Sequence, residues 1–191
     1  MNPALTLILV LLVIAAVGAV IYLYMRDRRT KQLRARFGPE YSRVINETGD
    51  RRKAEASLER RAERVKALAI HPLQPAESAR FSTRWDDAQT EFVDNPRDAV
   101  SHADTLLEDV MKARGYPISD FDRRSADLSV HYPRMVQNYR TAHEIALKNR
   151  RGEAGTEDLR QAMICYRTLF NELTADTLPQ QRDTRPQPAL H

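Results

Sequence analysis

Polar side chains that could do chemistry gather between positions 114 and 143 of this 191-residue chain. His143 follows Tyr139 by about one helical turn, and His131 precedes the same predicted helix. If the segment before that helix folds over it, two imidazoles and a carboxylate share a pocket suited to a metal ion or a general base. The candidate polar pocket consists of Arg114, Tyr116, Asp120, Asp122, His131, Tyr139, Arg140 and His143.

The same groups also fit a structural role, in which they satisfy helix ends and tie down a loop. His143-Glu144 is not followed by the second histidine that a helical zinc motif needs, and the sequence has no glycine-rich phosphate loop or nucleophile elbow. Cys165 is the only cysteine, which excludes an intramolecular disulfide, and it fits a small core residue. The sequence predicts no catalytic residue, cofactor or metal, and it favours a non-enzymatic protein without deciding the point.

The elements that position these residues follow an apolar run, Ala4 to Met25, of 22 residues without a charge. A helix of that length reaches roughly 33 Å, enough to cross a hydrocarbon core of about 30 Å. We therefore predict a single transmembrane helix, with residues 1–29 forming the anchor and its basic flank. A cleaved signal peptide is the alternative, with Val17-Gly18-Ala19 as a weak cleavage site.

The flanks of this run predict its orientation. Basic residues stay on the cytoplasmic side of a membrane, and they attract anionic lipid headgroups. The N-terminus is then outside and the main domain cytoplasmic; with a cleaved signal peptide the domain is extracytoplasmic instead. The predicted lipid headgroup contacts are Arg26, Arg28, Arg29, Lys31, Arg34 and Arg36.

Residues 30–70 are predicted to form charged juxtamembrane helices, a basic stalk broken at Gly38-Pro39 and Thr48-Gly49-Asp50. From Arg51 onward, one narrow apolar stripe runs along a charged helix. This pattern suits either a solvated spacer or a short dimeric coiled coil.

Residues 71–174 are predicted to be a bundle of four or five helices, so the fold class is all-α. Long helices are expected over about 76–93, 96–114, 133–149 and 156–174, and a short one over 120–128, with a loop at 129–132. Their inner faces carry apolar residues at helical spacing, with Trp85 as a core anchor. The tail, 175–191, is rich in proline and polar residues and is predicted to be disordered.

Five short motifs resemble those of an uncharacterised bacterial group of small, membrane-anchored helical proteins. The resemblance covers about residues 36–173, and it implies one helical domain but no activity, cofactor or catalytic residue. The motifs are Arg36-Phe37-Gly38-Pro39-Glu40-Tyr41, Arg114-Gly115-Tyr116-Pro117, Leu128-Ser129-Val130-His131, Tyr139-Arg140-x-Ala142-His143 and Thr156-Glu157-x-Leu159-Arg160-Gln161-Ala162-Met163.

Charge is divided unevenly along the chain, with +7 over residues 26–66 and −3 over residues 71–174. A basic segment beside an acidic domain disfavours nucleic acid as a partner and favours a membrane surface. We expect a single-pass, membrane-anchored interaction or scaffold module at the inner membrane face, with a protein partner of unknown identity. The alternative is a membrane-tethered metal-binding protein or enzyme that uses the region of His131 and His143.

Overall fold

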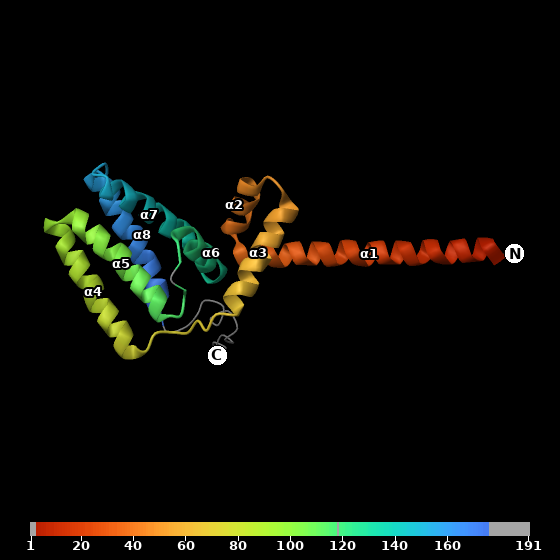
Figure 1. Cartoon of the computed structure of the whole chain (residues 1–191), viewed down its shortest axis with the longest axis horizontal. Coiled ribbons are helices and arrows are strands. Elements are labelled where there is room, and N and C mark those ends of the chain that lie inside the picture. The colour runs from red at the N-terminus through yellow and green to blue at the C-terminus, as the bar shows by residue number, and fades with distance from the viewer. Residues whose placement is uncertain (1–2, 118, 176–191) are drawn as a thin grey trace, which may run out of the picture. The chain divides into compact units, whose positions relative to one another are not determined.

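The computed structural model describes the backbone of residues 3–117 and 119–175, and the side chains of residues 11–117 and 119–175. Over these residues the chain forms eight α-helices and no strand, which confirms the all-α prediction (Figure 1). It divides into two compact units, Met1–Glu59 and Arg60–His191. The predicted disordered tail lies outside the described residues apart from Ala175.

Helix α1, Pro3–Phe37, joins the predicted apolar run and the basic flank in one uninterrupted helix. The helical part of the prediction is confirmed, but its membrane-spanning part is not supported. Among the described residues, no helix combines the length and the apolar character that crossing a bilayer requires. Positions 4–10 of the predicted run lie outside the described side chains.

In the first unit, the end of α1 is joined to α2, Pro39–Thr48, and to the beginning of α3, Arg51–Lys66, around one buried carboxylate. Glu55 of α3 accepts hydrogen bonds from the hydroxyls of Thr30 at 2.9 Å and Tyr41 at 2.7 Å, and from Nε of Arg51 at 3.0 Å. Burial tends to raise the pKa of Glu55, but these hydrogen bonds and the charge of Arg51 bring it below its ordinary value.

The charged stalk is therefore not a freely solvated spacer at this point. Leu58, on its predicted apolar stripe, and Ala54, one turn before it, are fully buried, and Phe37 and Tyr41 are buried as well. An ion pair between Arg29 and Glu59 adds a second link between α1 and α3. The first half of α3 is thus held against α1 and α2, because Glu55 and Glu59 pair with residues of those helices.

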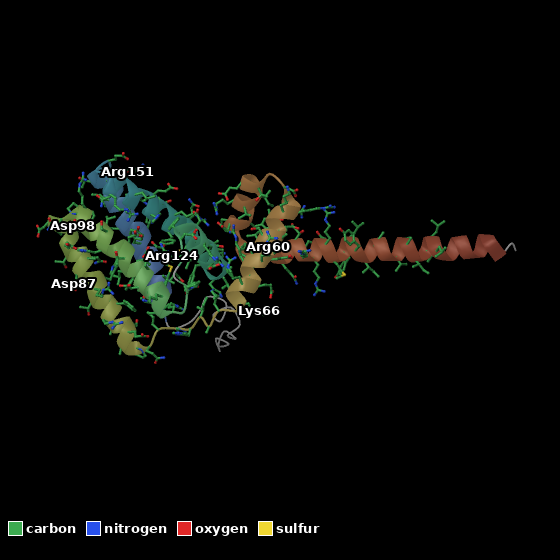
Figure 2. The ribbon with its side chains drawn as sticks, viewed as in Figure 1. Arg60, Lys66, Asp87, Asp98, Arg124 and Arg151 are labelled. Carbon is green, nitrogen blue, oxygen red and sulfur yellow. The ribbon has the colours of Figure 1, made fainter. Side chains whose placement is uncertain are left out.

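The second unit is a bundle of α4, Pro75–Asp94, α5, Pro96–Ala113, α7, Val136–Arg150, and α8, Thr156–Thr174. Helix α5 contacts α4 on one side and α8 on the other, and α7 packs against α8 (Figure 1). A shorter helix, α6, Phe121–His131, packs against α7. The charged Asp87, Asp98 and Arg151 lie on the outside of the bundle (Figure 2).

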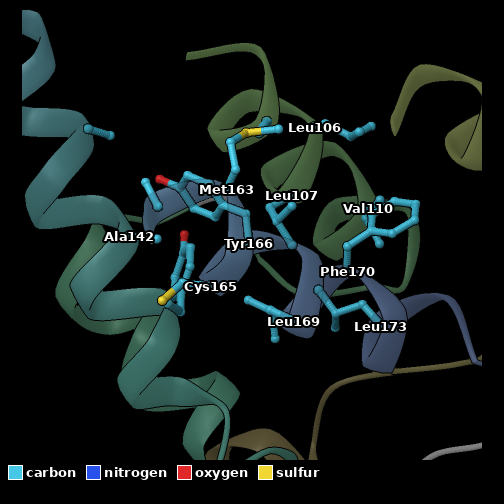
Figure 3. Close-up of a cluster of buried hydrophobic side chains, with 14 of the residues drawn as sticks. Leu106, Leu107, Val110, Ala142, Met163, Cys165, Tyr166, Leu169, Phe170 and Leu173 are labelled. Atoms are coloured by element: carbon cyan, nitrogen blue, oxygen red, sulfur yellow. The ribbon is translucent and has the colours of Figure 1, made fainter. Parts of the chain in front are cut away.

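The bundle core consists of the apolar stripes that the sequence predicts. Leu106, Leu107 and Val110 of α5 meet Leu169 and Phe170 of α8 in the interior (Figure 3). Trp85 of α4 is only 4% exposed, and its ring stacks on that of Phe170 with 5.0 Å between centroids. Burial of these side chains supplies the main favourable free energy of the fold.

The segment before α4 is tied closely to the end of α5. The backbone N–H of His71 donates to the carbonyl of Arg114 at 3.0 Å. Gly115 has φ +91°, and a Cβ built on it would lie 2.6 Å from the carbonyl oxygen of Ala69. Glycine is required here because any side chain would overlap that backbone atom. The compact unit accordingly includes residues ahead of the predicted domain start at His71.

Two predicted boundaries differ in the structure. Positions 129–131 were predicted as part of a loop, but they continue α6, and α7 begins at Val136 instead of Pro133. Tyr132 precedes a proline, which disfavours helical backbone angles at that residue, so α6 ends directly before it. The carbonyl of Tyr132 then accepts from the N–H groups of Met135 and Val136, each at 3.0 Å, in the turn that starts α7.

Candidate functional site

A buried carboxylate, Asp104 of α5, lies at the centre of a polar cluster in the bundle. Asp104 is 5% exposed. The hydroxyl of Tyr166 in α8 donates to its Oδ1 at 2.7 Å, and Nδ1 of His143 in α7 lies 3.7 Å from the same oxygen. Nη1 of Arg150, also in α7, lies 3.5 Å from Oδ2. One carboxylate thus links three helices.

Electrostatics shift the pKa values of Asp104 and Tyr166 in opposite directions. Burial tends to raise the pKa of Asp104, but His143, the Tyr166 hydroxyl and the charge of Arg150 together lower it below its ordinary value. Burial, with the adjacent carboxylate, raises the pKa of Tyr166 well above its ordinary value. At neutral pH the carboxylate is therefore ionised and the phenol is a fixed donor.

The imidazole of His143 packs against an aromatic ring. Its imidazole stacks on Phe121 of α6 with 3.7 Å between centroids and an interplanar angle of 6°. The ring of Tyr139 also packs against Phe121, tilted by 44°, with 5.0 Å between centroids. A carboxylate beside an imidazole is the arrangement that orients a catalytic base, but a base also needs an open side from which to reach a substrate. The stacked Phe121 ring covers one face of the imidazole, so the geometry favours a structural role.

Arg124 of α6 (Figure 2) extends this cluster toward α5. Its Nε donates to the hydroxyl of Tyr139 at 2.9 Å, and its Nη2 pairs with Glu108 at 2.6 Å. Burial raises the pKa of Tyr139 above its ordinary value, although Arg124 acts in the opposite direction. The pairing of Arg124 fixes α6 against α5 and α7.

The second histidine belongs to a different set of contacts. Nδ1 of His131 lies 2.9 Å from the hydroxyl of Tyr116, and burial raises the pKa of that tyrosine above its ordinary value. Arg114 is fully buried at the end of α5, and its Nη1 donates to the carbonyl of Leu173 at the end of α8. Within the described residues, Nε and Nη2 of Arg114 have no hydrogen-bond partner.

The structure thus divides the candidate pocket into two sets. Tyr116 contacts His131, whereas Tyr139 and His143 share Phe121, and each histidine has its own polar partner. Asp120 is the N-cap of α6 and accepts from the N–H of Arg123 at 2.8 Å; Asp122 lies exposed in the first turn, and Arg140 is partly buried on α7. Among the described residues there is no group of three or more His, Cys, Asp or Glu side chains that could hold a metal ion.

Sequence reasoning did not place three of the residues that make these contacts, Asp104, Arg124 and Tyr166, in the candidate pocket. The signal for Asp104 was its position on the inner face of its helix, between the predicted core residues Val100 and Leu107. A carboxylate at such a position requires buried donors. The identity of those donors depends on helices far away in the sequence.

The pH dependence of stability tests this description of Asp104. Tyr166→Phe is expected to lower the free energy of unfolding by about 1–3 kcal/mol at pH 7, because it deprives a buried carboxylate of a donor. The folded pKa of Asp104 is lowered, so its stabilising effect is present above the unfolded pKa of about 4 and is lost as the pH falls through the folded pKa. The difference between wild type and variant should therefore shrink below about pH 4.

Urea unfolding of the full chain in mild detergent, followed by circular dichroism between pH 7 and pH 3, measures this difference. Tyr139→Phe is the matched control, because that hydroxyl is bonded to Arg124 and not to a carboxylate. The loss of unfolding free energy caused by Tyr139→Phe should change little between pH 7 and pH 3. A cost of Tyr166→Phe that stays constant with pH would contradict the role given to Asp104.

One open groove lies on the outside of the bundle, between α4 and α8. It has a volume of about 180 Å³ and is lined by Trp85, Gln89 and Phe92 of α4 and by Arg160, Met163, Ile164 and Arg167 of α8. Ile164 is 44% exposed. Arg160 pairs with Glu157, whereas Arg167 has no ion pair with any described residue. The groove is thus apolar at its base and basic along the α8 side.

Comparison of the chain with protein-family models, with curated proteins and with solved structures gave no match. The resemblance to a bacterial group of membrane-anchored helical proteins stays a prediction.

Proposed function

We propose that this protein is a single-pass, membrane-anchored helical module whose bundle binds a protein partner at the inner membrane face. The observation that carries the proposal is the exposed apolar surface of α1. Every large apolar side chain between Leu11 and Met25 is exposed, with exposed fractions of 52 to 66%. These residues fill positions 11–14 and 20–25 without a gap, and each of these stretches covers at least one full turn of the helix, so apolar side chains are exposed on all of its faces.

An apolar helix exposed on every face needs a cover, since soluble proteins rarely present such a surface to water. A bilayer covers all faces at once. The proposal uses the whole uncharged run of the sequence, Ala4 to Met25, whose length suits a hydrocarbon core. Tyr22 and Tyr24 stand at its end, where aromatic rings favour the headgroup level.

The six basic residues of 26–36 orient the anchor with its N-terminus outside and make contact with anionic lipid headgroups. The positive charge of this basic segment is neutralised only in part. Arg29 pairs with Glu59, and Lys31 pairs with Asp27 at 2.8 Å, while Arg26 and Arg28 have no ion pair with a described residue.

The groove between α4 and α8 supports a role in binding a protein. Its base presents Trp85, Met163 and Ile164, and aromatic and methionine side chains are enriched at binding surfaces. The occupant that fits is a partner segment with an apolar side chain for the base and an acidic residue for Arg167. A second candidate function, as a metal-binding protein or enzyme, finds no support in contacts that place the two histidines in separate sets.

Reporter fusions in a bacterial host test the anchor and its orientation. A C-terminal alkaline phosphatase fusion should be inactive, a C-terminal fluorescent fusion that folds in the cytoplasm should be active, and the chain should stay in the membrane pellet after alkaline carbonate washing. An active phosphatase fusion would overturn the orientation. A mature N-terminus near Val20 would show instead that the run is a cleaved signal peptide.

Site-specific photocrosslinking tests the groove. A photoreactive residue at Ile164 should crosslink a partner in native membranes, and Arg167→Glu should abolish the product because it reverses the charge beside the groove. The matched control is Leu147, which is 38% exposed on α7 and does not line the groove. Equal products at both positions, or a product that persists in Arg167→Glu, would contradict the groove as the binding surface.

A further inference from the structure

A cleft in the first unit lies where the apolar part of α1 ends. It has a volume of about 740 Å³, and it is formed by one side of α1 between Tyr22 and Gln32 together with the first turns of α3. The hydrogen bonds of Thr30 and Tyr41 to Glu55, and the pair of Arg29 with Glu59, hold these helices together. The fold of the unit therefore builds the cleft, which a free helix would not possess.

One part of the cleft is strongly cationic. Arg26, Arg28 and Arg29 of α1 and Arg52 of α3 line it. Arg29 is paired with Glu59, but Arg26, Arg28 and Arg52 are exposed and have no ion pair with any described residue. Glu55, the one carboxylate among the described residues that line the cleft, is already bonded to Thr30, Tyr41 and Arg51. Three guanidinium groups are thus available to an anion.

The remainder of the cleft is aromatic and apolar. Tyr22, Tyr24 and Met25 line it and are 59 to 66% exposed. Tyrosine rings favour the boundary between hydrocarbon and headgroups, and arginine binds phosphate through paired N–H donors. A phospholipid is complementary to this arrangement, because its apolar acyl chains adjoin an anionic phosphate ester.

We propose that this cleft is a binding site for the headgroup of an anionic phospholipid. The phosphate lies between Arg26, Arg28 and Arg52, and the glycerol and upper acyl carbons lie against Tyr22 and Met25. This inference rests on the proposed membrane anchor, and it goes beyond general attraction to a basic flank by requiring Arg52. That residue is distant in sequence from the flank and reaches the cleft only through the packing of α3 on α1.

The test measures lipid binding by the purified full chain in a nonionic detergent. Short-chain dioctanoyl phosphatidylglycerol is titrated, with dioctanoyl phosphatidylcholine and inorganic phosphate as comparison ligands, and bound lipid is counted by native mass spectrometry. Arg52→Gln should weaken phosphatidylglycerol binding about tenfold, because it removes a charge-assisted contact to the phosphate. Arg28→Gln should do the same from α1.

Lys53→Gln is the matched control, since it removes one positive charge at the next position, and Lys53 is exposed and does not line the cleft. Its effect should be less than about twofold, as expected of a solvent-exposed, screened charge that makes no contact with the phosphate. Circular dichroism checks that the variants keep their helices. Equal weakening by Arg52→Gln and Lys53→Gln would overturn the site, as would equal binding of phosphatidylcholine or displacement of the lipid by millimolar phosphate.

Membrane fractionation of the same variants separates this inference from the proposed function. Arg52→Gln should remain in the carbonate-washed pellet like the wild type, because the anchor is intact. A wild-type chain that leaves the pellet refutes the anchor. Chains that stay in the pellet but bind phosphatidylglycerol equally well with and without Arg52 refute the cleft alone.

Discussion

Replacing Arg64 by methionine is expected to lower the free energy of unfolding by about 3–5 kcal/mol, as for other buried charges that lose their partner. Asp127 of α6 is fully buried, and its Oδ1 accepts from Nε of Arg64 at 2.8 Å and from Nη2 of the same guanidinium. Its other oxygen has no hydrogen-bond partner among the described residues. Methionine keeps much of the packing of the arginine stem but leaves the carboxylate uncompensated.

A second substitution, at Asp127, tests whether the uncompensated carboxylate causes the loss of stability. Asp127→Asn removes the buried charge, so the double variant Arg64→Met/Asp127→Asn should be more stable than Arg64→Met alone, although it carries one more change. Urea unfolding of the full chain in mild detergent, followed by far-ultraviolet circular dichroism, gives the free energies of unfolding of the wild type, the two single variants and the double variant. Costs that simply add would show that the two side chains do not depend on each other.

Trp85→Ala is expected to lower the free energy of unfolding by about 3–5 kcal/mol, the usual cost of removing a large buried aromatic ring. Trp85 is 4% exposed, and its ring stacks on Phe170 across the contact between α4 and α8. Its Nε1 also donates to Gln89 one turn further along the helix. The substitution removes the ring from the core and widens the groove whose base it forms.

Val93→Ala is the control on the same helix, because Val93 is 83% exposed and its truncation should cost less than about 0.5 kcal/mol. Both variants are unfolded in urea and followed by circular dichroism at 222 nm, since Trp85 itself cannot serve as the fluorescent probe. A Trp85→Ala variant as stable as the wild type would mean that α4 does not pack on α8 through this ring.

The sequence by itself determined the helices and most of their ends. Gly38-Pro39, Thr48-Gly49-Asp50 and Asn95-Pro96 break the chain at the positions where the structure ends one helix and begins the next. Proline and glycine act through the backbone of a few neighbouring residues, so their effect can be read locally. The apolar core stripes could also be predicted from the sequence, because helical periodicity places their residues on one face of a helix regardless of which helix packs against it.

Only the tertiary structure decided which polar groups meet. The residues of the predicted pocket separate into two sets, because His143 finds Asp104 and Phe121 while His131 finds Tyr116. Tyr166 reaches Asp104 from 62 positions away and Arg64 reaches Asp127 from 63. No local pattern contains such pairings.

Contacts between residues far apart in the sequence also decide the structure beside the basic flank. Periodicity predicted one charged helix with a narrow apolar stripe. It did not predict that Thr30 and Tyr41 donate hydrogen bonds to Glu55, or that Arg52 lines the same cleft as Arg26. A stripe specifies which face of a helix is buried but not what buries it. The choice of partner is made by the packing of whole helices, in which each buried polar group has to find a donor or an acceptor.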